Sequence, residues 1–436
     1  MRKLRTKIGA MIASAMLAVA MMAMPAGAAT AYTAIDGSTI NCTVDKYLVV
    51  KSDAVIPNAS FDFTIAPGTA IDAEDGKMAV YAGSNAVKLV AGTDVTVDST
   101  DNKKCTVSFD STDATIDETD RNGYTVNFST TTDTSDEKFA RKSFGVDFSD
   151  VTFSEPGVYR WIITEDVGKA ELTKGIKADT IGTRTIDVYV SDNAGALGIS
   201  ACVLHEGILA PAAGTNKGSA DVTGNGVALS DKSTGFTNKY GTQNLSFAKT
   251  VDGNQGSKDK FFQFKVTVTG VHDADSFQVI MTHATTQPEK TAATVYSASD
   301  MASANTLAAV SDAPAGEVYG KITGEQLKAG KYFYLSNDEY ITILGLPEGA
   351  VYTVEEEAED YLSTDGAGTY GGHEYTMDKT GEIALVDVYT GFTNTRDGVI
   401  PTGVILSVAP WVIAGIVIIG GIVFFAIRSR KKYEEE

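Results

Sequence analysis

A turn, a strand and an acidic residue follow one another in residues 156–165, which read Pro-Gly-Val-Tyr-Arg-Trp-Ile-Ile-Thr-Glu. Apolar and polar side chains largely alternate here, and Tyr, Trp and Ile favour β-structure. Only residues 301–310 and 323–328 favour a helix, and both are brief. The pattern predicts an all-β fold built from antiparallel sandwiches. Other runs of this kind, cut by Gly, Asp, Asn and Pro clusters, lie at 43–50, 60–65, 185–190, 261–269 and 350–354.

The same order of turn, Tyr-containing strand and acid recurs at residues 347–356, which read Pro-Glu-Gly-Ala-Val-Tyr-Thr-Val-Glu-Glu. The tetrapeptide Gly-Phe-Thr-Asn also occurs twice, at 235–238 and 391–394, each time closing a β-rich stretch. A strand that carries a lysine opens each half, with Lys46 in the first and Lys249 in the second. The chain therefore contains an internal repeat.

This repeat predicts two tandem β-sandwich domains, at residues 30–240 and 241–399. The first is longer and contains a Gly-, Ala- and Ser-rich stretch at 194–231, which we expect to form loops or an insertion.

Charged and amide side chains fall on the apolar face of the predicted strands. Residues i and i+2 share a face of a strand, so Lys46 points the same way as Val44 and Leu48. The same alternation places one lysine, one glutamate and one asparagine of each domain on the inward face of a strand. These residues are Lys46, Glu165 and Asn238 in the first domain and Lys249, Glu356 and Asn394 in the second.

An unpaired buried charge is costly, so the inward lysines and glutamates need a partner or a reaction. One interpretation is a buried Lys–Glu ion pair, or a register that leaves both side chains in solvent. The other is an intramolecular isopeptide bond, which the repetition of the same trio favours. Burial disfavours the charged form of each group, so a neutral lysine amine can attack the asparagine carbonyl. The protonated glutamate would stabilise charge on the carbonyl oxygen and transfer a proton as ammonia leaves.

The C-terminal 37 residues resemble a cell-wall sorting signal in their order. Ile400, Pro401, Thr402 and Gly403 precede an apolar run at 404–427 and a basic cluster. That run is long enough to cross a hydrocarbon core of about 30 Å, and the basic cluster would hold the C-terminus in the cytoplasm. A sortase would attack the Thr402 carbonyl and release the chain from Gly403 onward. The alternative is a single-pass protein in which Pro-Thr-Gly occurs by chance.

The N-terminus has the features of a signal peptide. Four basic residues precede an Ala- and Met-rich apolar run, and small residues follow before a cut after Ala28 or Ala29. Residues 1–28 are therefore expected to be removed, although an uncleaved anchor is the other interpretation. Removal of both ends leaves residues 29–402 outside the membrane, with the precursor held in the membrane only temporarily.

The exported portion is strongly acidic. The full chain has 36 Lys+Arg and 56 Asp+Glu; the leader takes four basic residues, and the tail takes four basic and three acidic ones. This leaves 28 basic against 53 acidic residues, a net charge of −25. Such a surface argues against nucleic acid and anionic lipid as partners. With 43% hydrophobic residues the chain can still bury substantial cores.

Metal, cofactor and enzyme signals are weak. The four histidines have no ligand spacing, so we expect no metal site and no cofactor. No motif suggests turnover of an external substrate, so the expected chemistry is a single autocatalytic event in each domain. The three cysteines form no paired pattern. Cys42 and Cys105 are expected to face a core as free thiols, with a Cys42–Cys105 bridge as the alternative.

The chain resembles the streptococcal backbone pilins that are built from isopeptide-linkage domains. The resemblance rests on Lys46 with its neighbours, on residues 54–65, on residues 148–159 and on the C-terminal Pro401-Thr402-Gly403 with the span that follows. It implies two Ig-like (CnaB-like) domains with Lys46–Asn238 and Lys249–Asn394 bonds, assisted by Glu165 and Glu356. It also implies a subunit of a sortase-assembled, wall-anchored pilus of a Gram-positive bacterium.

In that family a sortase joins the C-terminal threonine of one subunit to a lysine of the next, so Thr402 is the implied acyl donor. The family places the acceptor shortly before the first-domain asparagine, where Lys232 lies; Lys217 and Lys239 remain alternatives. The sorting motif lacks the residue that the LPxTG pattern has between Pro and Thr, which implies a pilus-specific sortase. The other implied partners are identical subunits and, in addition, tip or minor pilins. A monomeric wall-anchored adhesin or minor pilin is the alternative function.

Overall fold

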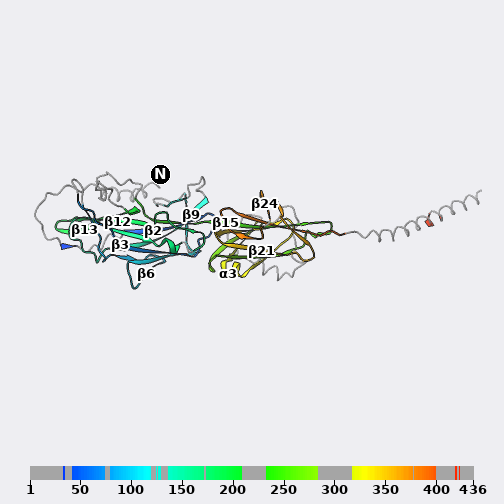
Figure 1. Ribbon diagram of the computed structural model, residues 1–436, viewed down its shortest axis with the longest axis horizontal. Coiled ribbons are helices and arrows are strands. Elements are labelled where there is room, and N and C mark those ends of the chain that lie inside the picture. Colours follow the sequence, from blue (N-terminus) through cyan, green and yellow to red (C-terminus); the bar gives the residue numbers. More distant parts are fainter. Residues whose placement is uncertain are drawn as a thin grey trace, which may run out of the picture.

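The computed structural model describes residues 33–34, 42–73, 79–118, 124, 126–128, 136–170, 173–208, 232–282, 317–376, 378–398, 418, 419 and 422. Within these ranges the chain forms two β-sandwiches that lie end to end (Figure 1). The predicted all-β sandwich class is therefore confirmed.

The first sandwich consists of an eight-stranded and a six-stranded sheet. The larger sheet has the order β1-β13-β12-β10-β3-β7-β6, and β4 pairs with β10; its strands are β1 (Thr33–Ala34), β3 (Ala59–Pro67), β4 (Val80–Ala82), β6 (Val95–Val97), β7 (Lys104–Phe109), β10 (Gly157–Glu165), β12 (Thr183–Asp192) and β13 (Ala196–Glu206). The smaller sheet has the order β11-β14-β2-β9-β5, and β8 pairs with β9; its strands are β2 (Cys42–Lys51), β5 (Lys88–Val90), β8 (Thr115–Asp117), β9 (Glu137–Asp147), β11 (Ile176–Lys177) and β14 (Gly235–Tyr240). A short helix, α1 (Val167–Ala170), follows β10.

Strand β10, which contains the stretch quoted first, shows why the two sheets pack together. Trp161 and Ile163 are fully buried and belong to the core between the sheets. The Trp161 ring lies 4.9 Å from that of Phe148, and its Nε1–H donates to the Ser84 carbonyl at 2.9 Å. Burying such side chains stabilises the sandwich by about 1.5–3 kcal/mol each. Glu165 continues the same face, so the alternation that builds the core also carries a carboxyl group into it.

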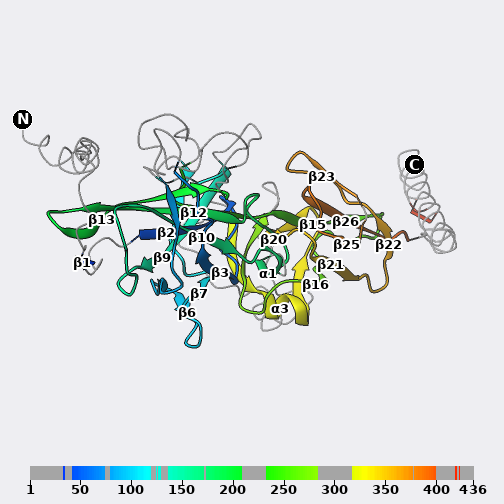
Figure 2. The same ribbon diagram turned by 60° about the vertical axis from the view of Figure 1, so that its left-hand side comes forward.

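The second sandwich repeats this plan. Its six-stranded sheet has the order β18-β17-β20-β15-β26-β22, and the arrangement of β20, β15 and β26 is visible in Figure 2. The strands are β15 (Thr242–Asp252), β17 (Ser276–Thr282), β18 (Glu317–Thr323), β20 (Glu339–Pro347), β22 (Leu362–Asp365) and β26 (Val388–Thr395). The facing sheet, β19-β16-β21-β25, comprises β16 (Phe262–Thr269), β19 (Lys331–Leu335), β21 (Val351–Glu357) and β25 (Thr380–Glu382), and β23 (Gly368–Tyr370) forms a separate hairpin with β24 (His373–Tyr375).

In each sandwich the first and last long strands lie side by side and run parallel. β2 pairs with β14, and β15 pairs with β26. The glycine of each Gly-Phe-Thr-Asn repeat lies against neighbouring backbone, Gly235 against β2 and Gly391 against Ala367 and Tyr375. A Cβ atom on Gly235 would lie 1.7 Å from the Asp45 carbonyl oxygen, and one on Gly391 would lie 2.5 Å from the Ala367 nitrogen. Only glycine fits at these two positions without moving the backbone.

Polar contacts join the two sandwiches, and Gly241 alone separates β14 from β15. Asp275 of the second domain accepts hydrogen bonds from the Asn58 N–H at 2.8 Å and from its side chain at 3.2 Å. Lys177 and Glu348 form an ion pair of 2.7 Å across the same junction. These contacts hold the two domains in line.

Two sequence expectations about local structure can be compared with the fold. Residues 323–328 form helix α3 (Gly324–Ala329), capped by Thr323 and Gln326, as predicted. The expectation that 194–231 forms loops or an insertion is wrong for residues 196–206, which form β13 of the larger sheet. This strand pairs with β12 over its length, so tertiary pairing overrides the weak propensity of its glycine and alanines. The predicted helix at 301–310 lies outside the described residues.

The predicted processing segments also fall almost wholly outside the described residues. The signal peptide at 1–28 and Ile400, Pro401, Thr402 and Gly403 are not described, and only three positions of the 404–427 span are. In the part of the chain that the structure describes, no helix is long and apolar enough to cross a membrane.

Candidate functional site: a lysine, a glutamate and an asparagine in each core

Lys46 lies in the middle of β2 and is completely buried. Its Nζ sits over the ring of Phe61, 4.2 Å from the centroid, and is 5.8 Å from that of Phe63. Burial lowers the pKa of Lys46 to about 8, and the attraction of Glu165 only partly opposes this. At a given pH, a larger fraction of Lys46 is therefore in the neutral amine form, which is the nucleophilic form, than of a lysine in solvent.

Glu165 and Asn238 flank this amine. Lys46 Nζ lies 2.8 Å from Glu165 Oε1 and 2.5 Å from Asn238 Oδ1. Glu165 arrives from β10 in the facing sheet, and Asn238 arrives from β14 beside β2. Among the described residues, neither Glu165 Oε2 nor Asn238 Nδ2 has a hydrogen-bond partner. The structure therefore brings the three predicted residues of the first domain together.

A loop segment that sequence reasoning missed completes the first site. The backbone N–H of Asp179 donates to Asn238 Oδ1 at 3.2 Å. The Asp179 carboxylate forms a 2.7 Å ion pair with Arg184, and both side chains are 1% exposed. Arg184 shares the inward face of β12 with Ile186 and Val188, so the strand count that revealed Lys46 could also have revealed Arg184. No sequence signal marked Asp179, because it lies in a loop.

The second domain brings its own trio together. Lys249 Nζ lies 2.7 Å from Glu356 Oε1, and Asn394 Nδ2 donates to that same oxygen at 2.9 Å. Lys249 is fully buried, with its Nζ 4.5 Å from the Phe262 ring centroid. Burial again lowers the lysine pKa to about 8, against the opposing effect of Glu356. The Asn394 oxygen has no partner in the described part of this domain.

The candidate lysines for joining subunits differ in their surroundings. Lys232 is exposed and forms an isolated bridge with His205 three residues before β14 begins. Lys239 lies within β14 and is half-buried, and burial lowers its pKa. Lys217 lies outside the described residues. Of the two described lysines, Lys232 is therefore the more accessible.

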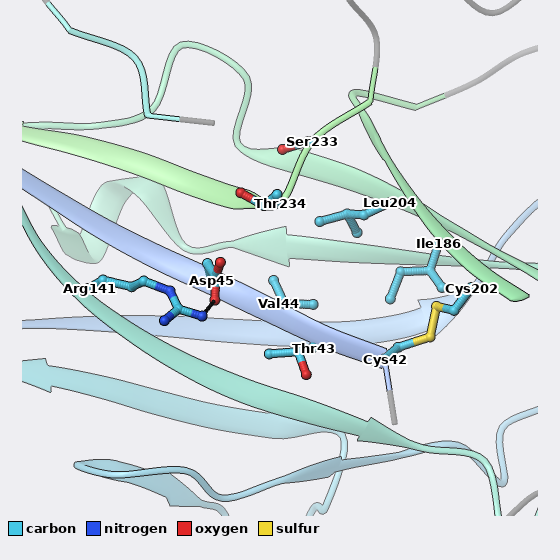
Figure 3. A pocket seen from close by; sticks show the side chains of 10 residues that line it. All are labelled: Cys42, Thr43, Val44, Asp45, Arg141, Ile186, Cys202, Leu204, Ser233 and Thr234. Atoms are coloured by element: carbon cyan, nitrogen blue, oxygen red, sulfur yellow. Dashed lines mark ion pairs between the residues drawn. A yellow bond between two sulfur atoms is a disulfide. The ribbon is translucent and has the colours of Figure 1, made fainter. Parts of the chain in front are cut away.

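The expectation of a buried free thiol is confirmed for Cys105 and wrong for Cys42, and the alternative Cys42–Cys105 bridge is also wrong. Cys42 forms a disulfide with Cys202, with a Cα–Cα distance of 5.9 Å, and Cys105 is the buried free thiol. Cys42 begins β2 and Cys202 lies on β13, so this bond links the two sheets beside a pocket that also contains the Asp45–Arg141 ion pair of 2.9 Å (Figure 3). The sequence did not reveal the pairing because residues around Cys202 were expected to form a loop.

No group of three or more His, Cys, Asp or Glu residues within the described ranges could hold a metal.

Comparisons with known proteins agree with this architecture. Residues 43–241 match the family model described as Spy0128-like isopeptide containing domain, and residues 243–396 match a domain of unknown function, DUF7601. The chain is 27% identical over 418 residues to a protein named Pilin from Streptococcus pyogenes serotype M1, covering 91% of this chain and 94% of that one.

Two solved structures to which the chain is similar come from the same species. The major pilin of Streptococcus pyogenes is 21% identical, with a TM-score of 0.47 and coverage of 82% of this chain and 99% of that one. The major pilin protein T3.2 from serotype GAS13637 is also 21% identical, with a TM-score of 0.43 and coverage of 82% and 98%.

The fold and the two buried trios define a protein of two tandem β-sandwiches, each with a lysine, a glutamate and an asparagine in its core. More particularly, residues 43–241 match the Spy0128-like isopeptide containing domain, and the resemblance of the chain to backbone pilins of the streptococcal type is confirmed.

Proposed function

We propose that this protein is the shaft subunit of a sortase-polymerised pilus and that each domain forms an autocatalytic Lys–Asn isopeptide bond. The bonds join Lys46 to Asn238 and Lys249 to Asn394, with Glu165 and Glu356 as the assisting acids. The observation that carries the proposal is the duplicated burial of a lysine amine against a glutamate, with an asparagine amide in the same cluster. Both reactions are single events and need no external substrate.

The chemistry follows from the contacts of the first site. The neutral Lys46 amine attacks Cγ of Asn238, and negative charge develops on Oδ1. Glu165, in contact with Nζ, takes up a proton from the amine and returns one to the departing Nδ2. The Nζ–Cγ bond forms, the Cγ–Nδ2 bond breaks, and ammonia leaves. Fixed proximity in a rigid core supplies much of the rate, because no encounter step remains.

The proposed bonds connect the first and last long strands of each domain, which are already neighbours in the sheet. Lys46 and Asn238 sit on parallel neighbouring strands but are 192 residues apart in sequence. A cross-link of this kind holds the first and last strands together even when the hydrogen bonds between them break. Such a subunit suits a thin fibre that must resist pulling and proteolysis.

Assembly is proposed to use Thr402 as the acyl donor and Lys232 as the acceptor of the next subunit. The exposure of Lys232 supports it over the half-buried Lys239. The partners are then a pilus-specific sortase, identical subunits, and tip or minor pilins. The product is a cell-wall-anchored surface polymer whose precursor is held in the membrane until it is sorted.

Intact-mass measurement of the recombinant residues 29–402 tests the internal bonds. With the Cys42–Cys202 disulfide reduced, the expected mass is lower than calculated by two ammonia equivalents. A variant with Lys46→Met and Lys249→Met is the matched control and should show the full calculated mass. A full mass for the unmodified protein would contradict the proposed bonds.

Boiled cell-wall extract on a denaturing gel tests the polymer. A covalent shaft gives a ladder of high-mass species, and Lys232→Arg should collapse it to the monomer. A single band from the unmodified protein would favour the monomeric adhesin instead. Persistence of the ladder in Lys232→Arg would move the acceptor role to another lysine.

A further inference from the structure

The carbonyl oxygen of Asn238 has a second polar neighbour besides Lys46. The segment between β11 and β12 passes over the asparagine, and the backbone N–H of Asp179 points at Oδ1 from 3.2 Å. Asn238 is fully buried and Asp179 is 6% exposed, so water has little access to this contact. Oδ1 is the atom on which negative charge develops when an amine attacks the amide. A fixed donor in a dry site stabilises such charge far more than it would in water.

The Asp179 side chain fixes the position of this N–H. Its Oδ2 accepts from the Thr237 N–H at 2.8 Å and from Arg184 Nη2 at 2.7 Å, while its Oδ1 accepts from the Ile181 N–H at 2.9 Å. Thr237 is the residue directly before Asn238. The carboxylate thereby attaches the loop to the strand that carries the reacting amide.

Arg184 makes the same connection from the other side. Its Nε donates to the Gly235 carbonyl at 2.9 Å, and its Nη1 donates to the carbonyls of Ile181 and Thr183. The guanidinium also lies 4.5 Å from the Phe236 ring centroid. One side chain therefore connects the loop, the start of β12 and the Gly-Phe-Thr-Asn segment.

Stability alone does not account for a buried ion pair such as Asp179–Arg184. Removing two charges from water costs several kcal/mol for each ion, and apolar residues of similar volume often serve stability as well or better. What the pair supplies here is geometry, because its contacts with Thr237 and Gly235 hold the 179–184 segment against β14, and its other contacts fix the conformation of the segment itself.

We propose that the Asp179 backbone N–H is an oxyanion donor for the Lys46–Asn238 reaction and that Arg184 is the residue that positions it. The inference rests on the proposed isopeptide function and adds the group that stabilises its intermediate. Nζ attacks Cγ, the carbonyl electron pair moves to Oδ1 under the Asp179 N–H, and it returns as the Cγ–Nδ2 bond breaks. The proton lost by Nζ leaves with the amide nitrogen as ammonia, through Glu165.

The second domain provides an internal reference. In the described part of that domain the Asn394 oxygen has no hydrogen-bond donor, and Asn394 contacts Glu356 through its nitrogen. A change at the Asp179 loop should therefore slow closure of the first domain and leave the second unaffected.

The experiment follows bond formation in both domains during a pulse of cell-free synthesis. Samples are denatured and digested at intervals, and the two cross-linked peptides are quantified by mass spectrometry. An amide-to-ester replacement at residue 179, made with the α-hydroxy analogue of aspartate, removes only the N–H. We expect closure of the first domain to slow about 10²-fold, the usual effect of losing one oxyanion donor, with an unchanged rate in the second.

Arg184→Met and Arg184→Lys test the positioning role. Arg184→Met should slow first-domain closure, and Arg184→Lys should restore part of the rate. The same substitutions in a Lys46→Met background report folding separately, by resistance to protease. A lower thermal stability with an unchanged closure rate would make Arg184 merely structural and overturn its assigned role.

If Arg184→Met does not fold, the ester variant still tests whether the Asp179 N–H is the oxyanion donor. Wild-type closure in the ester variant would overturn the Asp179 N–H as donor. Absence of both cross-linked peptides from the unmodified protein would instead overturn the proposed function itself, so the two failures can be told apart.

Discussion

The two domains place the same three residue types on corresponding strands, yet they surround them differently. In the first, the asparagine oxygen faces the lysine and a backbone N–H, and a buried Asp179–Arg184 pair stands behind them. In the second, the asparagine nitrogen faces Glu356. The cation over the aromatic ring of the repeat is also different, since Arg184 lies over Phe236 and the more exposed Lys379 lies over Phe392.

The comparison distinguishes the trio itself from the groups that surround it. The trio is set by strand alternation and is common to both domains. The groups that contact the trio come from loops and from the ends of other strands, and these differ. We therefore expect both domains to react, but with unequal dependence on their surroundings.

Removal of either glutamate should have the largest effect and should be confined to its own domain. Glu165→Ala is expected to leave the first domain unlinked, raising the mass by one ammonia equivalent. Loop-closure entropy for a cross-link of this span amounts to about 5 kcal/mol, so thermal and proteolytic resistance of that domain should fall sharply. Glu356→Ala is the matched variant for the second domain. Retention of the mass loss in Glu165→Ala would refute the role of Glu165.

The disulfide should stabilise the first domain alone. With the isopeptide bond in place, Cys42–Cys202 closes a ring of roughly 40 residues, for which the same entropy model gives about 4 kcal/mol. Reduction, or Cys42→Ser, should therefore lower the unfolding temperature of the first domain and leave the second unchanged, as measured by calorimetry. Cys105→Ser is the control for loss of a buried thiol without loss of a bond. An equal response of the two domains would contradict the assignment.

The unlinked first domain should become more stable as pH rises above 8. In Asn238→Ala, Lys46 keeps its buried position with a pKa near 8 in the folded state, against 10.5 for an ordinary lysine. The unfolded chain therefore binds more protons between these values, and stability increases across this window. The total effect is roughly 3 kcal/mol, from the cost of about 1.4 kcal/mol for each pKa unit.

Denaturant titrations between pH 8 and 9.5 measure this slope before the tyrosines of the unfolded chain begin to ionise. In the double variant with Asn238→Ala and Lys46→Met, stability should no longer increase with pH in this range. A slope of the same size in the double variant would assign the effect to another group.

The smallest expected effect concerns Lys379. Its charge helps to lower the pKa of Lys249, although burial is the main cause. Because the Lys379 side chain is 42% exposed, solvent weakens this contribution. In Lys379→Met, the pH midpoint for closure of the second domain should rise by a fraction of a unit, while that of the first domain stays constant. Peptide quantification over a pH series measures both, and a parallel shift in the two domains would exclude a local charge effect.

Much of the site could be predicted because the evidence for it is local. Alternation along a strand assigns Lys46, Glu165 and Arg184 to the core without knowledge of which strands pair. The Gly-Phe-Thr-Asn repeat likewise locates both asparagines. Asp179 escaped prediction because a loop has no fixed period, and its contact with Asn238 depends on where β11 and β12 lead the chain.

The sequence alone determined the all-β class, the duplication and the inward-facing trios, because a period of two residues is a property of the backbone itself. Only the tertiary structure decided which sulfur Cys42 meets, which way each asparagine amide faces and which N–H reaches Oδ1. These features depend on strand order and on the path of loops between sheets, where residues far apart in sequence come within a few ångströms of each other.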